Sequence, residues 1–232
     1  MSAPTARIAL VIPALNEEHA LPKVFAELPT GLFRQIIVID NGSTDQTAEV
    51  ARRHAAEVVF EPRRGYGQAC LAGLTRVHLD TDIVVFLDAD ASDTPGEVFH
   101  LLAPLQTGAA DLAIGSRLLG QPEPGALYWH QRWGNRFFTA LIHWLFGVRF
   151  TDLGPFRAVR WRALQQLALQ DRDFGWTVEM QIKAARQGLR IVEVPVSCRR
   201  RLGRSKISGT WKGSLKAGSK IFWTILRLRL SR

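Results

Sequence analysis

The apolar run at residues 83–87, which ends in Asp88-Ala89-Asp90, constrains the fold of this chain more than any other stretch. Five consecutive β-branched, aromatic or aliphatic residues without polar alternation predict a strand that is buried on both faces of a sheet. Two carboxylates at its carboxyl end repel each other unless a bound divalent cation reverses the balance. We therefore expect Asp88 and Asp90 to bind Mg²⁺ or Mn²⁺ that bridges to substrate phosphates. A solvated turn is the alternative for so short a pattern.

Alternating strands and helices are expected before this run. Apolar segments at residues 7–12, 35–39 and 58–60 predict strands, and the segments after them carry apolar residues at helical spacing. Ser43 and Gln46 form a possible capping box for a helix that would extend to His54. Strands that alternate with helices predict right-handed crossovers, and hence an α/β fold with a mostly parallel sheet.

Ligands of an open parallel sheet bind beyond the carboxyl ends of its strands. That rule brings four loops to one rim, at residues 13–17, 40–45, 63–67 and 88–90. Asp40 follows an apolar strand as Asp88 does, so its carboxylate is a candidate for a nucleoside's ribose or base, with a helix-capping turn as the alternative. The backbone N–H groups of Gly65 and Gly67 are candidates for phosphate binding. Complete dinucleotide-binding and P-loop glycine signatures are missing.

A further strand is expected at residues 111–115, and Arg117 follows it. An arginine at such a rim suits a phosphate, and a surface ion pair is the alternative.

The charge of the chain is unevenly distributed. The 232 residues carry a formal net charge of +9, and 11 of the 30 basic residues but no acidic residue follow Glu193. The first 193 residues therefore hold 30 − 11 = 19 basic and 21 acidic side chains. A basic tail of this kind favours polyanions. Nucleic acid is not expected, because the body is nearly neutral and carries no recognised binding motif.

Two segments are dense in aromatic and basic residues. One spans residues 125–150, and the other is an amphipathic helix at residues 210–232, in which Lys212, Lys216 and Lys220 lie opposite an apolar face. Both compositions are typical of helices that lie on an anionic membrane surface, and packing against the body is the alternative. Residues 1–209, which include the 125–150 segment, are expected to form one domain.

Compartment signals are few. Cys70 and Cys198 lie far apart without metal-ligand spacing, which favours a reduced cytosolic setting. A secretory signal is not recognisable, and no apolar run reaches the roughly 18 residues of a spanning helix. We expect a peripheral protein on the cytoplasmic face of a membrane.

Six ordered motifs resemble those of the family 2 glycosyltransferases of the GT-A fold, and among them the polyprenyl (dolichyl) phosphate sugar synthases. The motifs lie at residues 11–18, 38–45, 87–90, 115–117, 154–157 and 201–206, and the similarity extends from Ala9 to about Lys216. The resemblance implies a GT-A fold and an inverting transfer of a sugar from a nucleotide-diphosphate donor, of the GDP-mannose or UDP-glucose type, to a polyprenyl phosphate.

The resemblance also implies roles for single residues. The donor site would contain Pro13, Ala14, Asn16, Glu17, Asp40, Gly65 and Ala89, with the metal on Asp88 and Asp90. The acceptor phosphate would face Arg117 and Arg132. A basic loop that closes over the diphosphate would contain Arg201, Ser205 and Lys206. Glu179 matches a glutamate of the group that orients either an arginine or the sugar.

The chain contains no Glu-Asp dipeptide, the pair that supplies a general base in many family 2 enzymes with hydroxyl acceptors. A hydroxyl must lose its proton during attack, whereas a lipid phosphate is already anionic and needs only positioning. Ser92 and Pro155 depart from the pattern of the synthases. A GT-A enzyme with a soluble acceptor and a non-catalytic membrane or nucleotide-binding scaffold are the alternative functions.

Overall fold

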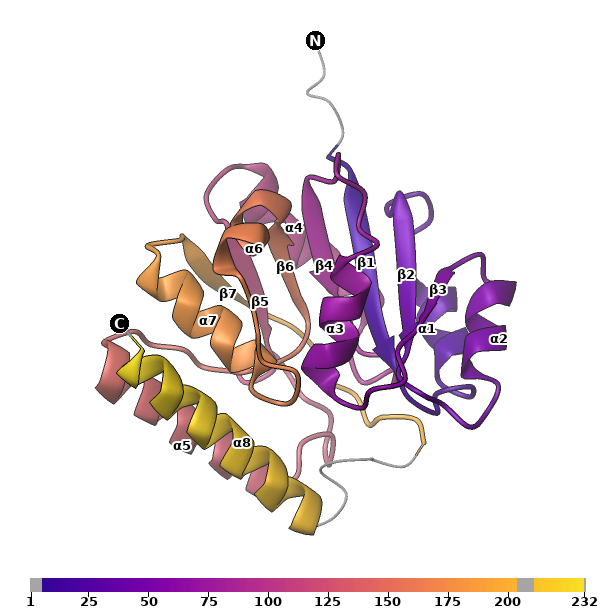
Figure 1. Cartoon of the computed structure of the whole chain (residues 1–232). Helices are drawn as coiled ribbons and strands as arrows, with labels where there is room; N and C mark the ends of the chain where they lie inside the picture. Colours follow the sequence, from indigo (N-terminus) through magenta and orange to yellow (C-terminus); the bar gives the residue numbers. More distant parts are fainter. Residues whose placement is uncertain (1–5, 204–210, 232) are drawn as a thin grey trace.

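The computed structural model describes residues 6–203 and 211–231, and its centre is one seven-stranded sheet in the order β3-β2-β1-β4-β6-β5-β7 (Figure 1). The strands are β1 (Ile8–Ala14), β2 (Gln35–Asp40), β3 (Glu57–Phe60), β4 (Ile83–Phe86), β5 (Leu112–Ser116), β6 (Arg157–Arg160) and β7 (Ile191–Pro195). Only β6 runs antiparallel to its neighbours, β4 and β5. The prediction of an α/β fold with a mostly parallel sheet is therefore confirmed.

Helices cover both faces of the sheet because the central strands are apolar on both sides. Leu10 and Ile12 of β1 point into one core and Ala9 and Val11 into the other. The first core is closed by α1 (Leu21–Glu27), α2 (Thr47–Arg53) and α4 (Val98–Gln106), which follows a short 3₁₀ helix at Pro95–Glu97. The second is closed by α3 (Tyr66–Leu74), α5 (Trp129–Phe146), α6 (Trp161–Leu167), α7 (Trp176–Arg186) and α8 (Trp211–Leu230).

α5 and α8 lie side by side at one edge of the molecule (Figure 1). α8 begins and ends close to the predicted bounds of 210–232. Its inner side packs on the body, because Thr224, Ile225 and Leu228 are buried, whereas Trp223 remains 67% exposed. The packing alternative therefore describes one side of α8 and leaves a second, exposed side. In the described part of the chain, no helix has the length and apolar character needed to cross a membrane.

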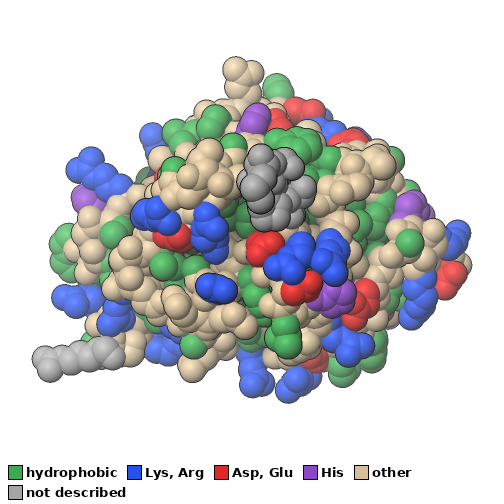
Figure 2. Space-filling view, turned by 90° about the horizontal axis from the view of Figure 1, so that it is seen from above, with side chains coloured by type: hydrophobic (Ala, Val, Ile, Leu, Met, Phe, Trp, Pro, Cys, Tyr) green, Lys and Arg blue, Asp and Glu red, His purple; other side chains and the backbone are tan. Residues whose placement is uncertain are grey.

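The end of the sheet at which the parallel strands begin carries paired charges. Arg7 and Arg34 contact Asp80 at 3.1 and 3.2 Å, and Arg190 contacts Asp111 at 2.8 Å. Figure 2 looks down on this end and shows basic and acidic side chains next to one another. Mixed charge of this kind gives no one-signed field for a charged ligand.

The predicted capping box is wrong. α2 begins at Thr47, and its N-cap residue Gln46 makes no side-chain capping hydrogen bond. The hydroxyl of Ser43 instead accepts a hydrogen bond from the backbone N–H of Asn16 at 2.9 Å. Ser43 thus joins the loops after β1 and β2, a long-range contact that local spacing does not reveal.

Candidate active site

The carboxyl ends of β1, β2 and β4 meet at one rim, as the parallel order requires. Ala14 pairs with Asp40 in register, and the N–H of Leu87 donates to the carbonyl of Val11 at 3.2 Å. A cavity of about 310 Å³ opens at this rim. The structure brings most of the predicted donor-site residues to its wall, namely Pro13, Ala14, Glu17, Gly65, Asp88, Ala89, Asp90 and Arg201.

Asp88 and Asp90 differ in their surroundings. The Oδ1 atom of Asp88 is buried and has no hydrogen-bond partner among the described residues. Burial, and next the charge of Asp90, raise the pKa of Asp88 to about 7. Asp90 accepts a hydrogen bond from the N–H of Ser92 at 2.9 Å, and its other oxygen lies 3.2 Å from the guanidinium of Arg201.

These two carboxylates fit a hard divalent cation. An unpartnered buried carboxylate oxygen is costly unless a cation reaches it, and Mg²⁺ and Mn²⁺ prefer oxygen ligands. No cluster of three or more His, Cys, Asp or Glu suited to a metal occurs among residues 6–203 and 211–231. Asp88 and Asp90 would therefore hold the ion from one side, and the remaining ligands would be water or phosphate oxygens.

The turn before α3 uses its amides within the protein. The N–H of Gly65 donates to Oδ1 of Asn41 at 3.0 Å, and the N–H of Gly67 donates to the carbonyl of Asp173 at 3.2 Å. Both donors that the sequence assigned to phosphate thus have protein acceptors. Gly65 still lines the cavity, and its φ of 142° lies where side chains are disfavoured.

Two predicted nucleoside residues lie at the rim but outside the cavity lining. Asp40 accepts a hydrogen bond from the N–H of Ser43 at 2.8 Å, the contact of a turn residue. Asn16 accepts one from the N–H of Thr44 at 2.7 Å. The residue after Asp40, Asn41, lines the cavity instead and holds the 61–65 loop through the carbonyls of Glu61 and Arg63.

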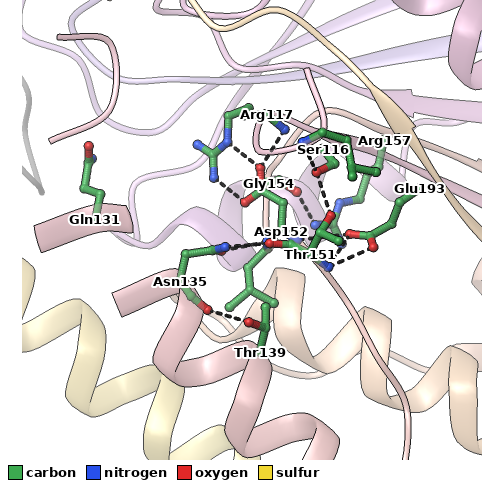
Figure 3. A network of polar contacts seen from close by, with 12 residues as sticks. Ser116, Arg117, Gln131, Asn135, Thr139, Thr151, Asp152, Gly154, Arg157 and Glu193 are labelled. Atoms are coloured by element: carbon green, nitrogen blue, oxygen red, sulfur yellow. Dashed lines mark hydrogen bonds and ion pairs between the residues drawn. The ribbon is translucent and has the colours of Figure 1, made fainter. Parts of the chain in front are cut away.

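Arg117 forms an ion pair with the buried Asp152 and does not line the cavity. Its guanidinium binds both oxygens of Asp152 at 2.8 Å, and its backbone N–H adds a third contact at 2.9 Å (Figure 3). Burial opposes the charge, yet the carboxylate of Asp152 raises the pKa of Arg117 above its usual value. Asn135 of α5 fixes the loop around Asp152, because its side chain donates to the carbonyl of Thr151 and accepts the N–H of Leu153. The ion-pair alternative therefore describes the observed contact, although the carboxylate partner is buried.

Arg157, from the fifth motif of the resemblance, is fully buried. Its guanidinium donates to the carbonyls of Thr177, at 3.0 Å, and Gly154, and burial lowers its pKa to about 10. Arg157 thus ties Gly154 and its loop to Thr177 of α7.

Two further predicted site residues, Arg132 and Glu179, do not line the cavity. Arg132 is exposed on α5 and does not line the cavity. Glu179 is buried on α7 and accepts hydrogen bonds from the N–H groups of Gln170, at 2.9 Å, and Asp171, at 2.6 Å. Glu179 also contacts Lys183 at 2.9 Å. Ser205 and Lys206 lie outside the described residues.

Sequence reasoning missed several residues of the cavity wall. They are Asn41, Arg64, Tyr66, Asp173, Phe174 and Lys216. Asn41 and Arg64 belong to loops that follow the carboxyl ends of strands. The expectation that ligands bind at these ends could therefore have identified them. Asp173, Phe174 and Lys216 come from α7's preceding loop and from α8, which reach the cavity by tertiary packing. Among the described residues, the cations of the wall are Arg64, Arg201 and Lys216.

Comparisons with known proteins agree with this geometry. The family described as "Glycosyl transferase family 2" matches residues 9–168. An uncharacterized glycosyltransferase of Mycobacterium tuberculosis is 41% identical over 224 residues, covering 94% of this chain and 97% of the relative. The undecaprenyl-phosphate mannosyltransferase of Micrococcus luteus is 31% identical over 247 residues, covering 97% of this chain and 99% of the relative.

Among solved structures, the glucosyl-3-phosphoglycerate synthase of Mycobacterium tuberculosis is similar, with a TM-score of 0.78 and 26% identity. The match covers 97% of this chain and 80% of that one, which was crystallised with Mn²⁺, UDP-glucose and phosphoglyceric acid. The fold, the rim with its two carboxylates and these matches lead to one conclusion. The chain is a member of glycosyl transferase family 2 and has the GT-A fold.

Proposed function

We propose that this glycosyltransferase moves a sugar from a nucleotide-diphosphate donor to a polyprenyl phosphate at the surface of a membrane. The observation that carries the proposal is the cavity wall, on which an acidic pair and three cations face the same space. The similarity to an undecaprenyl-phosphate mannosyltransferase over nearly the whole chain supports the lipid acceptor.

The donor's diphosphate is the part of the substrate that this wall suits. Arg64, Arg201 and Lys216 offer positive charge to it, and Asp88 with Asp90 would hold Mg²⁺ or Mn²⁺ against it. When bound, the ion supplies Lewis-acid stabilisation of the negative charge that builds on the departing nucleoside diphosphate. The salt bridge between Arg201 and Asp90 must open for this, since both groups then face other partners.

A phosphate acceptor needs little further from the protein. Its oxygen is anionic at neutral pH, so the chain has to orient it and screen its charge rather than remove a proton. Arg117 and Arg132 remain the proposed acceptor residues, with Arg117 held rigidly by Asp152. Because Asp152 already occupies two of its guanidinium nitrogens, Arg117 would be shared between that carboxylate and the acceptor phosphate.

Membrane association is proposed for α5 and α8. Trp129, Trp133 and Trp144 of α5 and Trp223 of α8 are each at least 67% exposed. The exposed side of α8 also carries Lys216, Lys220, Arg227 and Arg229. Exposed tryptophan beside basic residues is typical of helices at a membrane interface. We propose that the protein is peripheral and lies on the cytoplasmic face.

A soluble phosphorylated acceptor is the second candidate function. The glucosyl-3-phosphoglycerate synthase structure contains phosphoglyceric acid, a small phosphorylated anion without a lipid chain. With this acceptor, the exposed aromatic side chains of α5 and α8 would have no part in the reaction. A non-catalytic scaffold would bind nucleotide or membrane without turnover.

One experiment separates the three candidates. The purified chain is incubated with Mn²⁺ or Mg²⁺, a panel of UDP- and GDP-sugars, and either a short polyprenyl phosphate or phosphoglyceric acid. We expect an organic-extractable, lipid-linked sugar with one donor. Transfer to phosphoglyceric acid alone would support the soluble acceptor, and release of no product with any donor would support the scaffold.

A further inference from the structure

The loop at residues 170–175, between α6 and α7, connects the C-terminal helix to the cavity. Asp173 and Phe174 of this loop line the cavity. The carbonyls of Arg172 and Asp173 accept hydrogen bonds from the amides of Gln68, at 2.9 Å, and Gly67, at 3.2 Å. The loop therefore forms one wall of the cavity and also fixes the start of α3, which carries Tyr66 on another wall.

The contact between this loop and α8 is short and buried. Asp171 accepts a hydrogen bond from the hydroxyl of Thr224 at 2.7 Å, and its second oxygen accepts the N–H of Asp173 at 2.8 Å. Asp171 and Thr224 are 4% and 3% exposed. One carboxylate thus bridges α8 to the backbone of a residue on the cavity wall, and its burial makes the loss of either partner costly.

The packing around this hydrogen bond leaves little freedom. A Cβ atom on Gly175 would lie 2.2 Å from Oγ1 of Thr224 and 2.4 Å from Oδ2 of Asp171. Only a residue without a side chain allows α8 to approach the loop this closely. Glu179 supports the same arrangement, since it holds the amides of Gln170 and Asp171 and lies 3.8 Å from Arg227 of α8.

α8 also reaches the cavity directly. Lys216 lines it, eight residues before Thr224 on the same helix. Eight residues of α-helix span about 12 Å, so a shift of α8 moves Lys216 and the Asp171 bridge together. The helix that exposes Trp223 therefore contributes to the cavity wall at two places, directly through Lys216 and indirectly through Thr224 and Asp171.

From these contacts we infer that Thr224 and Asp171 are positioning residues, through which α8 sets the geometry of the cavity wall at the 170–175 loop and the start of α3. The inference rests on the proposed function only where it treats the cavity as the donor site. Whatever holds α8 in place then also holds the wall in its binding geometry, so engagement of the exposed side of α8 and occupancy of the cavity favour each other.

Three variants of α8 test the inference. Thr224→Val keeps the shape of the side chain and removes the hydroxyl, Thr224→Ser keeps the hydroxyl, and Ser219→Ala is the matched control. Ser219 is exposed on the same helix, and its hydroxyl donates a hydrogen bond to the carbonyl of Lys216 at 2.9 Å. Thermal unfolding first establishes that each variant is folded.

The first measurement is hydrogen–deuterium exchange at the start of α3, which requires no ligand. We expect Thr224→Val to accelerate exchange of the Gly67 and Gln68 amides about tenfold or more, because Asp171 loses a buried partner. Thr224→Ser should exchange nearly as the unaltered chain does, and Ser219→Ala should match it. Equal exchange in Thr224→Val and the unaltered chain, or equal acceleration in all three variants, would overturn the inference.

The second measurement is calorimetric binding of Mn²⁺–UDP and Mn²⁺–GDP. We expect Thr224→Val to weaken the nucleotide that binds by about tenfold, and Thr224→Ser to restore it. An unchanged Kd in Thr224→Val would refute the coupling to the cavity. If the unaltered chain binds neither nucleotide, the proposed donor site fails, and the exchange result still decides whether α8 positions the wall.

Discussion

The carboxylate of Asp88 occupies a site that is unfavourable for an anion until a cation arrives. It is buried, one oxygen has no partner among the described residues, and Asp90 adds a second negative charge nearby. A residue that served only stability would be uncharged or paired here. The cost therefore indicates a ligand-binding role, as strained or uncompensated groups at functional sites generally do.

Replacing Asp88 by Asn is expected to separate function from stability. Because the pKa of Asp88 is raised to about 7 in the folded chain, its neutral form favours folding, and this contribution is lost as the pH rises through about 7. Asp88→Asn should thus stabilise the metal-free protein at pH 8 and not at pH 4. The same change should lower sugar transfer by about 10²–10³-fold, the usual loss when one group that stabilises developing charge is removed.

Chemical denaturation at both pH values and Mn²⁺ titration by calorimetry check this prediction. Asp80→Asn is the control, because Asp80 lies in the paired charges at the opposite end of the sheet. Undiminished Mn²⁺–nucleotide binding in Asp88→Asn would contradict the metal assignment.

Glu61 predicts a pH dependence of opposite sign. Hydrogen bonds from Arg63 and then Gln68 lower its pKa to about 2, so its contribution to stability is present above about 4.5 and is lost as the pH falls through about 2. Glu61→Gln should lower the free energy of unfolding at pH 7, and the difference from the unaltered chain should shrink between about pH 4.5 and 2. Urea denaturation across this range measures it, and a difference that stays constant with pH would contradict the assignment.

The strands show which elements a sequence can specify. β1, β2 and β4 were predictable because buried parallel strands are continuous apolar runs. β6, Arg157–Arg160, was not, because it is short, has arginine at both ends and pairs antiparallel. The carboxylates at the end of β4 were predictable for the same reason as the strand, whereas Asp173 and Lys216 reach the cavity only through the packing of α7 and α8. Periodicity encodes an element and its ends, and tertiary contacts decide which distant elements meet there.

The start of α3 offers a test at the scale of the element. A Cβ on Gly67 would lie 2.1 Å from the carbonyl oxygen of Asp171, whereas one on Gly134 of α5 would meet nothing within 4 Å. Gly67→Ala should therefore force α3 from the 170–175 loop and cost about 2 kcal/mol or more of stability. Gly134→Ala should instead stabilise the chain by up to about 1 kcal/mol through helix propensity. Thermal and urea unfolding compare the two, and equal effects would contradict the close approach.

Across the whole molecule, paired charges and exposed tryptophans lie in different places. The end where the strands begin pairs its acids and bases (Figure 2), whereas α5 and α8 lie apart from it at one edge (Figure 1). These two helices expose Trp129, Trp133, Trp144 and Trp223. Lys216 connects this edge to the cavity. An acceptor whose phosphate enters the cavity while its apolar chain stays in a membrane matches this arrangement of polar and apolar surfaces.

Vesicle binding tests that arrangement directly. The double variant Trp129→Ala/Trp133→Ala removes two side chains that are 71% and 70% exposed, and should lower partitioning onto vesicles with anionic lipid by about tenfold or more. Leu79→Ala is the control, because Leu79 is 90% exposed but lies just before β4, at the end of the sheet that carries the paired charges.

Sedimentation with anionic and neutral vesicles at two salt concentrations measures the electrostatic and the aromatic contributions to binding. Binding to anionic vesicles should weaken with salt because the basic residues of α8 are screened, and the aromatic contribution should not. Equal partitioning of the double variant and Leu79→Ala would mean that α5 does not contact the bilayer, and the acceptor would then have to reach the cavity without a membrane-bound helix beside it.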